Sequence, residues 1–536
     1  MTTFAPVRGL RFREHAISGR RRPSAPLLLA ALTVAVVAAV PPIYLAVRVS
    51  DDPQVATSAV FARSTLELTV RTLTFAAAVT ALASAIALPM AWLTERTDLP
   101  ARRTLRVLSA LPLAVPTYVG AMVAISAFGP GGLVEDLIGR GLPGSIYGFW
   151  GATIVLALFT YPYFLLTVRP AVASLDPRLE DASRGVGYGR WTTFRRVVIP
   201  QLRPALSSGG LVVALYALAD FGAPSLMRFD SFTRVLFIRY ESTFDRTGAA
   251  ALAAVLALLA LSVVAFDVLT RGRRRYDAIR ATGAPEAPTI HLGRWRWPAL
   301  AFVAGILLLA LALPVGVLGY WLVRALAAGE AVRGVWDATR DTLLVAVMAA
   351  GLTAVAALPV ALLAVRHRRF PLSRPIEVLA YAGYALPGLV VALALVFAGI
   401  NFGPLYQSMA MLVIAYVLLF LPLAIGTTRV SLLQIRPSVE DAARGLGRSP
   451  LNVLRTVTVP LTLRGMLAGG ALVFLTTIKE LPATLILAPI GFDSLSVRVW
   501  SASSEAFFAR AALPALILLL LSSIPLAILE LTGRRR

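Results

Sequence analysis

The sequence predicts an all-α, polytopic membrane protein with about twelve transmembrane helices in two parallel six-helix repeats. Three observations support this fold class. Of the 536 residues, 58% are hydrophobic and 15% are charged, which is more apolar than a soluble core requires. Apolar stretches long enough to cross a bilayer recur along the whole chain. A polar loop sequence also occurs twice, once in each half.

The candidate spans follow from the need for about 20 mainly apolar residues to cross the hydrocarbon core. The fifth and eleventh are interrupted by Asp220 and by the pair Lys479-Glu480. The first span follows Arg20, Arg21 and Arg22, but it is longer than the apolar part of a signal peptide and is interpreted as an uncleaved helix. The spans are expected near 27–47, 72–93, 107–127, 149–168, 205–225, 248–269, 298–323, 342–365, 378–400, 408–428, 465–487 and 511–531.

Basic residues indicate the orientation of these spans. With the N-terminus in the cytoplasm, most of the 51 lysines and arginines fall in loops on the cytoplasmic side, as the positive-inside rule requires. We therefore expect both termini to be cytoplasmic. The net charge of +23 then reflects topology and contact with anionic lipid of the bilayer, and no nucleic-acid partner is expected.

The two halves of the chain repeat one another in order. ALPMAWL at 87–93 matches ALPVALL at 357–363, and LAVPTYVGAM at 113–122 matches YALPGLVVAL at 384–393. Since six spans is an even number, the repeats are expected to be parallel, with a pseudo-two-fold axis along the membrane normal and a path between them. The expected domains are a basic cytoplasmic N-terminus (1–26), a first transmembrane domain (27–270), a cytoplasmic linker (271–297), a second transmembrane domain (298–531) and a basic tail (532–536).

The repeated loop is the most informative segment. EDASRGVGYGRWTTFRRVVIP at 180–200 returns as EDAARGLGRSPLNVLRTVTVP at 440–460. An acidic pair with small residues suits the start of a short helix, and the glycine suits a tight turn. A second amphipathic segment then runs to the proline. We expect a helix, a turn and a helix along the inner face, where another protein docks. The candidate docking residues are Glu180, Asp181, Ala182, Ser183, Gly187, Pro200, Glu440, Asp441, Ala442, Ala443, Gly447 and Pro460.

An interfacial hairpin that anchors arginines to lipid is the alternative for one such loop, but the same spacing found twice disfavours it. The pattern of acid, Ala, Ala, three residues, Gly and about a dozen residues to Pro resembles the cytoplasmic loop of permease subunits of ATP-binding cassette importers. The resemblance implies that each loop forms a coupling helix that is gripped by one of two copies of a cytoplasmic ABC ATPase. It also implies an external solute-binding protein and a location in the bacterial plasma (inner) membrane.

Energy supply is expected to come from those partners. Lys479 is the one lysine in the chain, and no Gly-x-x-x-x-Gly-Lys-Ser/Thr loop surrounds it. The chain is therefore expected not to be an enzyme and to bind no cofactor, with ATP and Mg on the partner ATPase. The chain has no cysteine, and its histidines, His15, His291 and His367, all lie beside arginine-rich segments, so no metal site is expected.

Two further segments resemble fused permeases of the ferric-iron importer group, which includes thiamine and phosphonate relatives. They are ADFGAPSLM at 219–227 and KELPATLILAPIGFDSLSVRVW at 479–500. The resemblance implies ferric iron as the solute, or thiamine or a phosphonate in the same architecture. Asp220, Lys479 and Glu480 are the candidate path residues. We hypothesise that the two acids pair across the pseudo-two-fold axis with the lysine as counter-ion; a structural ion pair is the alternative.

No carboxylate, tyrosine or histidine cluster that would handle naked ferric iron is evident in the sequence. The first outer loop is charged enough for a binding protein to dock, although a solvated surface explains it equally well. Its charged residues are Arg228, Asp230, Arg234, Arg239, Glu241, Asp245 and Arg246. An ion-coupled secondary transporter with two six-helix halves shares the span count, but two matched loops disfavour it. A membrane-embedded enzyme is disfavoured because no HExxH, paired-histidine or nucleophile motif is present.

Overall fold

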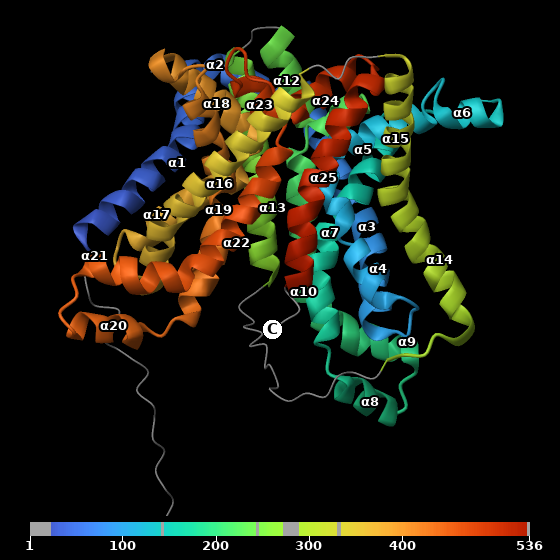
Figure 1. Cartoon of the computed structure of the whole chain (residues 1–536), viewed down its shortest axis with the longest axis horizontal. Helices are drawn as coiled ribbons and strands as arrows, with labels where there is room; N and C mark the ends of the chain where they lie inside the picture. The colour runs from blue at the N-terminus through green and yellow to red at the C-terminus, as the bar shows by residue number, and fades with distance from the viewer. Residues whose placement is uncertain are drawn as a thin grey trace, which may run out of the picture. The chain divides into compact units, whose positions relative to one another are not determined.

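The computed structural model describes residues 23–140, 144–242, 246–271, 289–329, 334–401 and 403–532 (Figure 1). Within these ranges the chain forms helices, and the one strand-like contact is an isolated bridge between Thr97 and Ile290. The predicted all-α class is confirmed. The expected N-terminal segment 1–26, linker 271–297 and tail 532–536 lie mostly outside the described residues, as does His15.

Eleven described helical runs are long and apolar enough to cross a membrane, or twelve if α17 and α18 together form one span. The prediction of about twelve spans is thus confirmed. Their helices are α1 (Ala25–Asp51), α3 (Arg63–Arg96), α5 (Thr117–Phe128) with α6 (Leu133–Ile138), α7 (Phe149–Ala173), α9 (Arg190–Thr193) with α10 (Ile199–Ala219), α13 (Arg246–Arg271), α14 (Arg296–Leu307) with α15 (Leu313–Ala327), α16 (Val335–Arg366), α17 (Ser373–Ala385), α18 (Gly388–Asn401), α19 (Met409–Gln434), α21 (Pro450–Val453) with α22 (Val459–Ile478), and α25 (Phe508–Thr532).

The span expected at 378–400 is divided between α17 and α18, and three other expected spans are also broken. The span expected at 107–127 consists of α4 (Arg102–Leu108), a 3-10 turn (Leu111–Ala114) and α5, because Pro112 and Pro116 supply no backbone N–H to continue one helix. The span expected at 205–225 ends at Ala219 and is followed by α11 (Gly222–Leu226). The span expected at 465–487 ends at Ile478 and is followed by α23 (Pro482–Leu487). The last two breaks confirm the interruptions expected at Asp220 and Lys479-Glu480.

Short helices that the sequence pattern did not indicate complete the connections. They are α2 (Pro53–Phe61), α12 (Phe232–Ser242) and α24 (Leu495–Ser504). The repeated loops contribute α8 (Pro177–Gly185) and α20 (Pro437–Gly445), which the sequence did predict. None is long enough to cross a bilayer, so a search for apolar runs does not detect α2, α12 or α24.

Packing does not follow the two halves of the sequence. The chain forms two compact units, one of residues 40–349, 384–419 and 474–536, the other of residues 1–39, 350–383 and 420–473. In the larger unit α14 and α15, from the second half, contact α3 and α5 of the first half. In the smaller unit Ala31 of α1 lies in one apolar cluster with Ala357 and Val360 of α16. In each unit the first span of one half therefore packs on helices of the other.

Within the smaller unit α22 approaches α19 closely at Gly469. A Cβ atom at this position would lie 2.4 Å from the Thr427 hydroxyl oxygen and 2.9 Å from the Cα atom of Ala424. Both distances are below van der Waals contact, so only glycine permits this separation of the two backbones. Small residues at such crossings allow the dispersion contacts on which helix association in membranes depends.

Replacing Gly469 by leucine is expected to force α22 away from α19, and so to lower both the yield of monodisperse protein and its thermal unfolding midpoint. Gly305 in α14 is the matched control, because a Cβ atom there meets nothing within 4 Å. Size-exclusion chromatography and thermal unfolding in detergent measure both quantities. Equal behaviour of Gly469→Leu and Gly305→Leu would contradict the close packing.

Candidate functional site

Both repeated loops contain the short helix and the glycine turn that the sequence predicted. In the first loop the Asp176 carboxylate accepts a hydrogen bond from the backbone N–H of Arg178 at 2.9 Å and caps α8. Gly187 follows with a φ of +91°, and Gly447 follows α20 with a φ of +82°. L side chains rarely adopt such values, so the glycines are required by the turn itself.

The segment after each glycine differs from the prediction of a separate helix that closes at proline. α9 continues through a π-turn (Phe194–Val198) into α10, and α21 continues through a π-turn (Leu454–Thr458) into α22. Pro200 and Pro460 each stand in the first turn after their π-turn. Proline has no N–H, and its ring crowds the carbonyl four residues earlier, so a wider turn lets the helix run on. Each amphipathic segment is therefore the beginning of a span.

The first loop is tied to the end of α3 by a buried ion pair. The Glu180 side chain accepts a hydrogen bond from Arg96 Nη2, and residue exposure is 6% for Glu180 and 3% for Arg96. Arg96 is the last residue of α3, and its Nη1 also donates to the carbonyl of Leu175 at 3.5 Å. A charge-assisted pair that is shielded from water is stronger than an exposed one. The position of α8 is thus set by α3.

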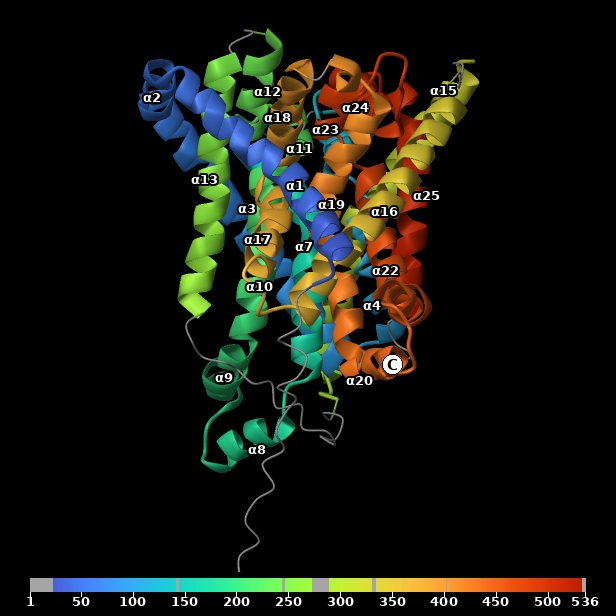
Figure 2. The same cartoon turned by 90° about the vertical axis from the view of Figure 1, so that its left-hand side faces the viewer.

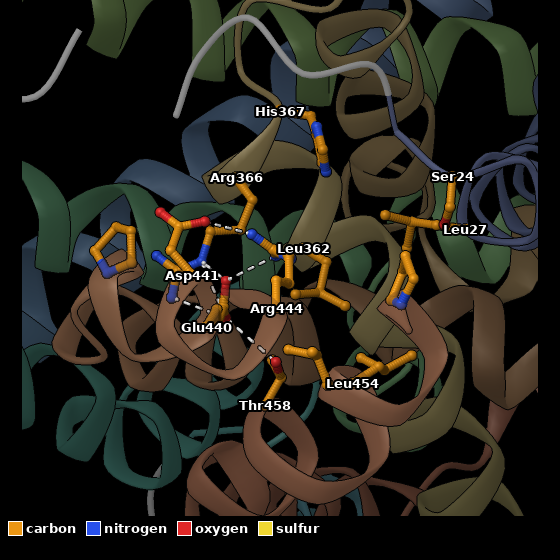
Figure 3. Close-up of a pocket in the computed structure, with 13 residues that line it drawn as sticks. Ser24, Leu27, Leu362, Arg366, His367, Glu440, Asp441, Arg444, Leu454 and Thr458 are labelled. Atoms are coloured by element: carbon orange, nitrogen blue, oxygen red, sulfur yellow. Dashed lines mark hydrogen bonds and ion pairs between the residues drawn. The ribbon is translucent and has the colours of Figure 1, made fainter. Parts of the chain in front are cut away.

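The second loop repeats this arrangement at the end of α16 (Figure 3). Arg366 donates to both carboxylate oxygens of Glu440, from Nε to Oε2 at 3.1 Å and from Nη2 to Oε1 at 3.2 Å. The hydroxyl of Thr458 donates to Oε1 at 3.2 Å, and Arg366 Nη2 donates to the carbonyl of Ile435 at 3.0 Å. We call the pairs Arg96–Glu180 and Arg366–Glu440 the two clamps.

The clamps divide each acidic pair into an inward and an outward member. We expected both acids to face a docking partner, but the glutamates are used within the chain. Asp181 and Asp441 are exposed, and Arg444 Nη1 donates to Asp441 Oδ1 at 2.7 Å. Ala182 and Ala442 are also exposed, whereas Ser183 and Ala443 are buried. The surface open to a partner is therefore an aspartate and an alanine on each short helix.

The clamp arginines were not identified in the sequence analysis, although a signal for them exists. Each stands three residues after one of the matched segments, 87–93 and 357–363. The arginine and its glutamate are separated by 84 residues in the first half and 74 in the second, so local spacing does not connect them. The repeated sequence therefore contains both clamp arginines, but only the fold shows that each one pairs with the glutamate of its loop.

The two loops differ behind the clamps. In the first, the rings of Trp92 and Phe194 pack edge to face with centroids 5.5 Å apart, and the Arg96 guanidinium lies 5.4 Å from the Trp92 ring. By the repeat, Leu362 and Leu454 correspond to these two aromatic residues. In the second loop a cavity of about 400 Å³ is lined by these leucines and by the clamp itself. The two loops thus expose the same residue types, but different side chains pack on their buried sides.

Asp220 lies where α10 ends and is held by neutral donors. Its Oδ1 accepts a hydrogen bond from the Thr117 hydroxyl at 2.6 Å, and its Oδ2 accepts one from the Ala223 N–H at 3.1 Å. The Thr233 hydroxyl donates to the main-chain carbonyl of Asp220 at 2.7 Å. Asp220 is 9% exposed, so its carboxylate closes the break between α10 and α11 with little contact to solvent.

Glu480 occupies the corresponding break after α22. Its Oε1 accepts a hydrogen bond from the Ala483 N–H at 3.3 Å, and its main-chain carbonyl accepts one from the Thr484 hydroxyl at 2.6 Å. A Cβ atom on Gly388 would lie 2.7 Å from Glu480 Oε1, so the carboxylate packs directly on the backbone there. Thr117 and Gly388 follow the matched prolines Pro116 and Pro387 and therefore correspond in the repeat. The longer side chain of Glu480 thus faces glycine, whereas the shorter side chain of Asp220 faces threonine.

Lys479 does not act as the counter-ion that we hypothesised. Its Nζ donates to the carbonyl of Leu113 at 2.8 Å, and within the described residues no ion pair joins it to Asp220 or Glu480. A carbonyl at a broken span is an unsatisfied acceptor, and the ammonium group satisfies it.

Part of the charged outer loop is also visible. Arg234 pairs with Asp230, and the Arg228 guanidinium lies 4.7 Å from the Tyr147 ring. Asp245 lies outside the described residues. Among the residues that the structure describes, no group of three or more histidine, cysteine, aspartate or glutamate side chains could hold a metal ion.

Comparison with known proteins gives the family context of these features. Residues 83–277 and residues 357–536 each match the family described as binding-protein-dependent transport system inner membrane component. The two matched stretches each contain one repeated loop, one clamp glutamate and one of the two buried acids. The duplication therefore corresponds to two copies of one family domain.

Individual relatives match the chain over different lengths. The chain is 34% identical to the Fe(3+)-transport system permease protein FbpB 2 of Haemophilus influenzae over 449 residues, which are 82% of this chain and 85% of the relative. It is 26% identical to the ferric transport system permease protein FbpB of Actinobacillus pleuropneumoniae over 415 residues, 71% of this chain and 60% of the relative. The sulfate transport system permease protein CysT of Escherichia coli is 30% identical over 187 residues, 34% of this chain and 67% of the relative.

Arg366→Met is expected to lower the free energy of unfolding by about 3–5 kcal/mol, because the buried Glu440 carboxylate then keeps only the partly exposed Arg444, 3.7 Å away, as a cation. The double variant Arg366→Met, Glu440→Met is expected to recover most of this loss, since no buried charge remains. Denaturant unfolding in detergent measures the difference. Arg63→Ala breaks an ion pair whose arginine side chain is 93% exposed, and little change is expected. An equal effect of Arg366→Met and Arg63→Ala would refute the buried clamp.

Proposed function

Because the chain belongs, in both halves, to the family of binding-protein-dependent transport system inner membrane components, we propose that it is the fused permease of an ATP-binding cassette importer for ferric iron. The chain would form the translocation path, an external binding protein would deliver the ion, and separate ATPase subunits would drive transport. The observation that carries the choice of solute is the 34% identity to a ferric-iron permease over 82% of this chain.

We propose that each repeated loop docks one ATPase, giving two copies per chain. The two loops present the same exposed aspartate and alanine and the same buried glutamate. Each clamp ends a long span, α3 with 34 residues and α16 with 32. A displacement of α8 or α20 by a docked ATPase would pass through an arginine–carboxylate pair into a helix. It would therefore not be absorbed by a flexible linker.

The proposed orientation places the loops and both termini in the cytoplasm of a bacterial cell, because most lysines and arginines then obey the positive-inside rule. ATP and Mg²⁺ would bind to the ATPase and not to this chain, whose single lysine donates to the Leu113 carbonyl. The chain would thus contribute the path and the coupling surface, and no hydrolytic chemistry.

Docking is tested by arginine substitutions on the exposed small residues. Ala182→Arg with Ala442→Arg is expected to prevent co-purification of the ATPase, because a bulky cation replaces the small contact surface on both short helices. Ala328→Arg, at an exposed position after α15, is the matched control and should leave co-purification unchanged. Retention of the ATPase by the double variant at the control level would refute docking at these helices.

Solute choice is tested in proteoliposomes that contain the chain, its ATPase and its binding protein. We expect uptake of iron supplied as ferric citrate, dependent on ATP and on the binding protein. ATP-driven uptake of sulfate, thiamine or a phosphonate with no iron uptake would overturn the solute and keep the importer. Uptake by the chain alone, driven by an ion gradient and indifferent to ATP, would favour the secondary transporter.

A further inference from the structure

The cavity beside the second clamp is lined by both apolar and charged side chains. Leu362 and Leu454 contribute apolar groups, and Arg366 and Arg444 contribute guanidinium groups. Figure 3 shows Leu27, in the first turn of α1, on the opposite side of the cavity from the clamp. The volume of about 400 Å³ lies within the range of small-molecule sites, about 300–1,000 Å³. The cavity therefore suits a ligand that is apolar at one end and charged at the other.

The first loop fills the corresponding space with aromatic side chains of its own. Trp92 and Phe194 pack where the second loop has two leucines, and the ring of Trp191 stacks on Phe194 with centroids 5.8 Å apart. Trp191 is 72% exposed, and tryptophan is favoured at the level of lipid headgroups. Leu451 takes the position of Trp191 in the second loop. The second loop thus lacks the aromatic filling and the aromatic anchor of the first.

The turns that follow the two clamp arginines differ in charge. By the repeat, Asp98-Leu99 corresponds to Arg368-Arg369. Leu99 is 3% exposed, and the Asp98 carboxylate accepts a hydrogen bond from the Leu292 N–H at 2.9 Å, so another segment of the chain covers this turn. Arg368 and Arg369 are exposed, directly after residues that line the cavity, and no carboxylate among the described residues pairs with either of them. The second turn therefore presents uncompensated positive charge beside the cavity.

Positive charge next to an apolar cavity favours an anionic amphiphile as the ligand. Segments 1–22 and 533–536 of the chain do not complement it, because the first has six arginines and one glutamate and the second has three arginines. Figure 2 shows that α1 begins at the end of the smaller unit that carries α20, so the cavity lies where a span starts. In the proposed orientation this is the level of the cytoplasmic leaflet, where basic pockets between spans bind anionic headgroups.

We propose that this cavity binds an anionic phospholipid of the cytoplasmic leaflet. Its phosphate lies beside Arg368 and Arg369, and the beginning of an acyl chain packs on Leu362 and Leu454. The lipid occupies the space that aromatic rings fill in the first loop, and it holds α20 against the end of α16. The inference rests on the proposed function only for the orientation of the loops.

Native mass spectrometry of the purified full chain, titrated with dioleoylphosphatidylglycerol in detergent, tests the site. We expect a single high-affinity lipid that dioleoylphosphatidylcholine does not replace. Leu362→Trp with Leu454→Phe gives the second loop the side chains of the first and should abolish this binding. Leu433→Trp with Leu467→Phe is the matched control, because both leucines are 64% exposed in the same compact unit, and binding should be unchanged.

A second pair of variants tests the charge without altering the cavity. Arg368→Gln with Arg369→Gln should weaken binding of the lipid about twentyfold, since each arginine near an anionic headgroup contributes about fivefold. Both side chains are exposed, so the fold should be retained. Arg102→Gln with Arg103→Gln removes the same charge beside the first loop and should leave the high-affinity lipid in place.

Unchanged binding in Leu362→Trp with Leu454→Phe would overturn the site. An equal loss in the two arginine double variants would also overturn it, because attraction would then be spread over the whole leaflet. Displacement of the lipid by millimolar inorganic phosphate or ATP would assign the cavity to a soluble phosphate compound and reject the lipid. Ferric uptake in proteoliposomes despite any of these results would leave the proposed function standing.

Discussion

Two arginine–glutamate pairs, in which both glutamates are buried, fix the geometry on which the other features of this protein depend. Arg96 ends α3 and meets Glu180 of α8; Arg366 ends α16 and meets Glu440 of α20. A buried ion pair contributes little net stability, since the Coulomb attraction mostly offsets the loss of hydration. Its effect is geometric. Each short helix is held to the end of one span, and the aspartate and alanine that face outward are presented in a defined orientation.

The two family domains of this chain differ behind a common exposed surface. Trp92 and Phe194 fill the first loop, whereas Leu362 and Leu454 leave a cavity in the second. The buried acids have diverged in a compensating way. Asp220 takes a hydrogen bond from Thr117, while Glu480, one methylene longer, packs on the backbone of Gly388. The exposed loop surface, by contrast, keeps the same aspartate and alanine in both halves.

Much of this arrangement could be predicted from the sequence. Length and apolarity defined the spans, and the acidic-glycine spacing gave the short helix and turn around Gly187 and Gly447. The residues that complete each site could not be found in this way. Arg96 is 84 positions from Glu180, and Thr117 is 103 positions from Asp220, so only the packing of the spans brings these partners together.

The prolines and the lysine were misjudged for a different reason. Pro200 and Pro460 usually end helices, but a π-turn before each allows the helix to continue. Lys479 adjoins Glu480 in sequence, but successive residues at a helix end point in different directions, and its ammonium group reaches the Leu113 carbonyl. The sequence had suggested a helix end at each proline and an ion pair for the lysine. In both cases the hydrogen-bonding needs of the backbone decided the structure instead.

We propose that the clamps transmit ATPase movement to the spans, and the ratio of solute taken up to ATP hydrolysed measures that transmission most directly. The ratio should be determined in proteoliposomes for the Arg366→Met, Glu440→Met double variant and for the unsubstituted chain. In the double variant we expect the ATPase to stay bound and to continue to hydrolyse ATP while the ratio falls severalfold. An unchanged ratio in the double variant would contradict it.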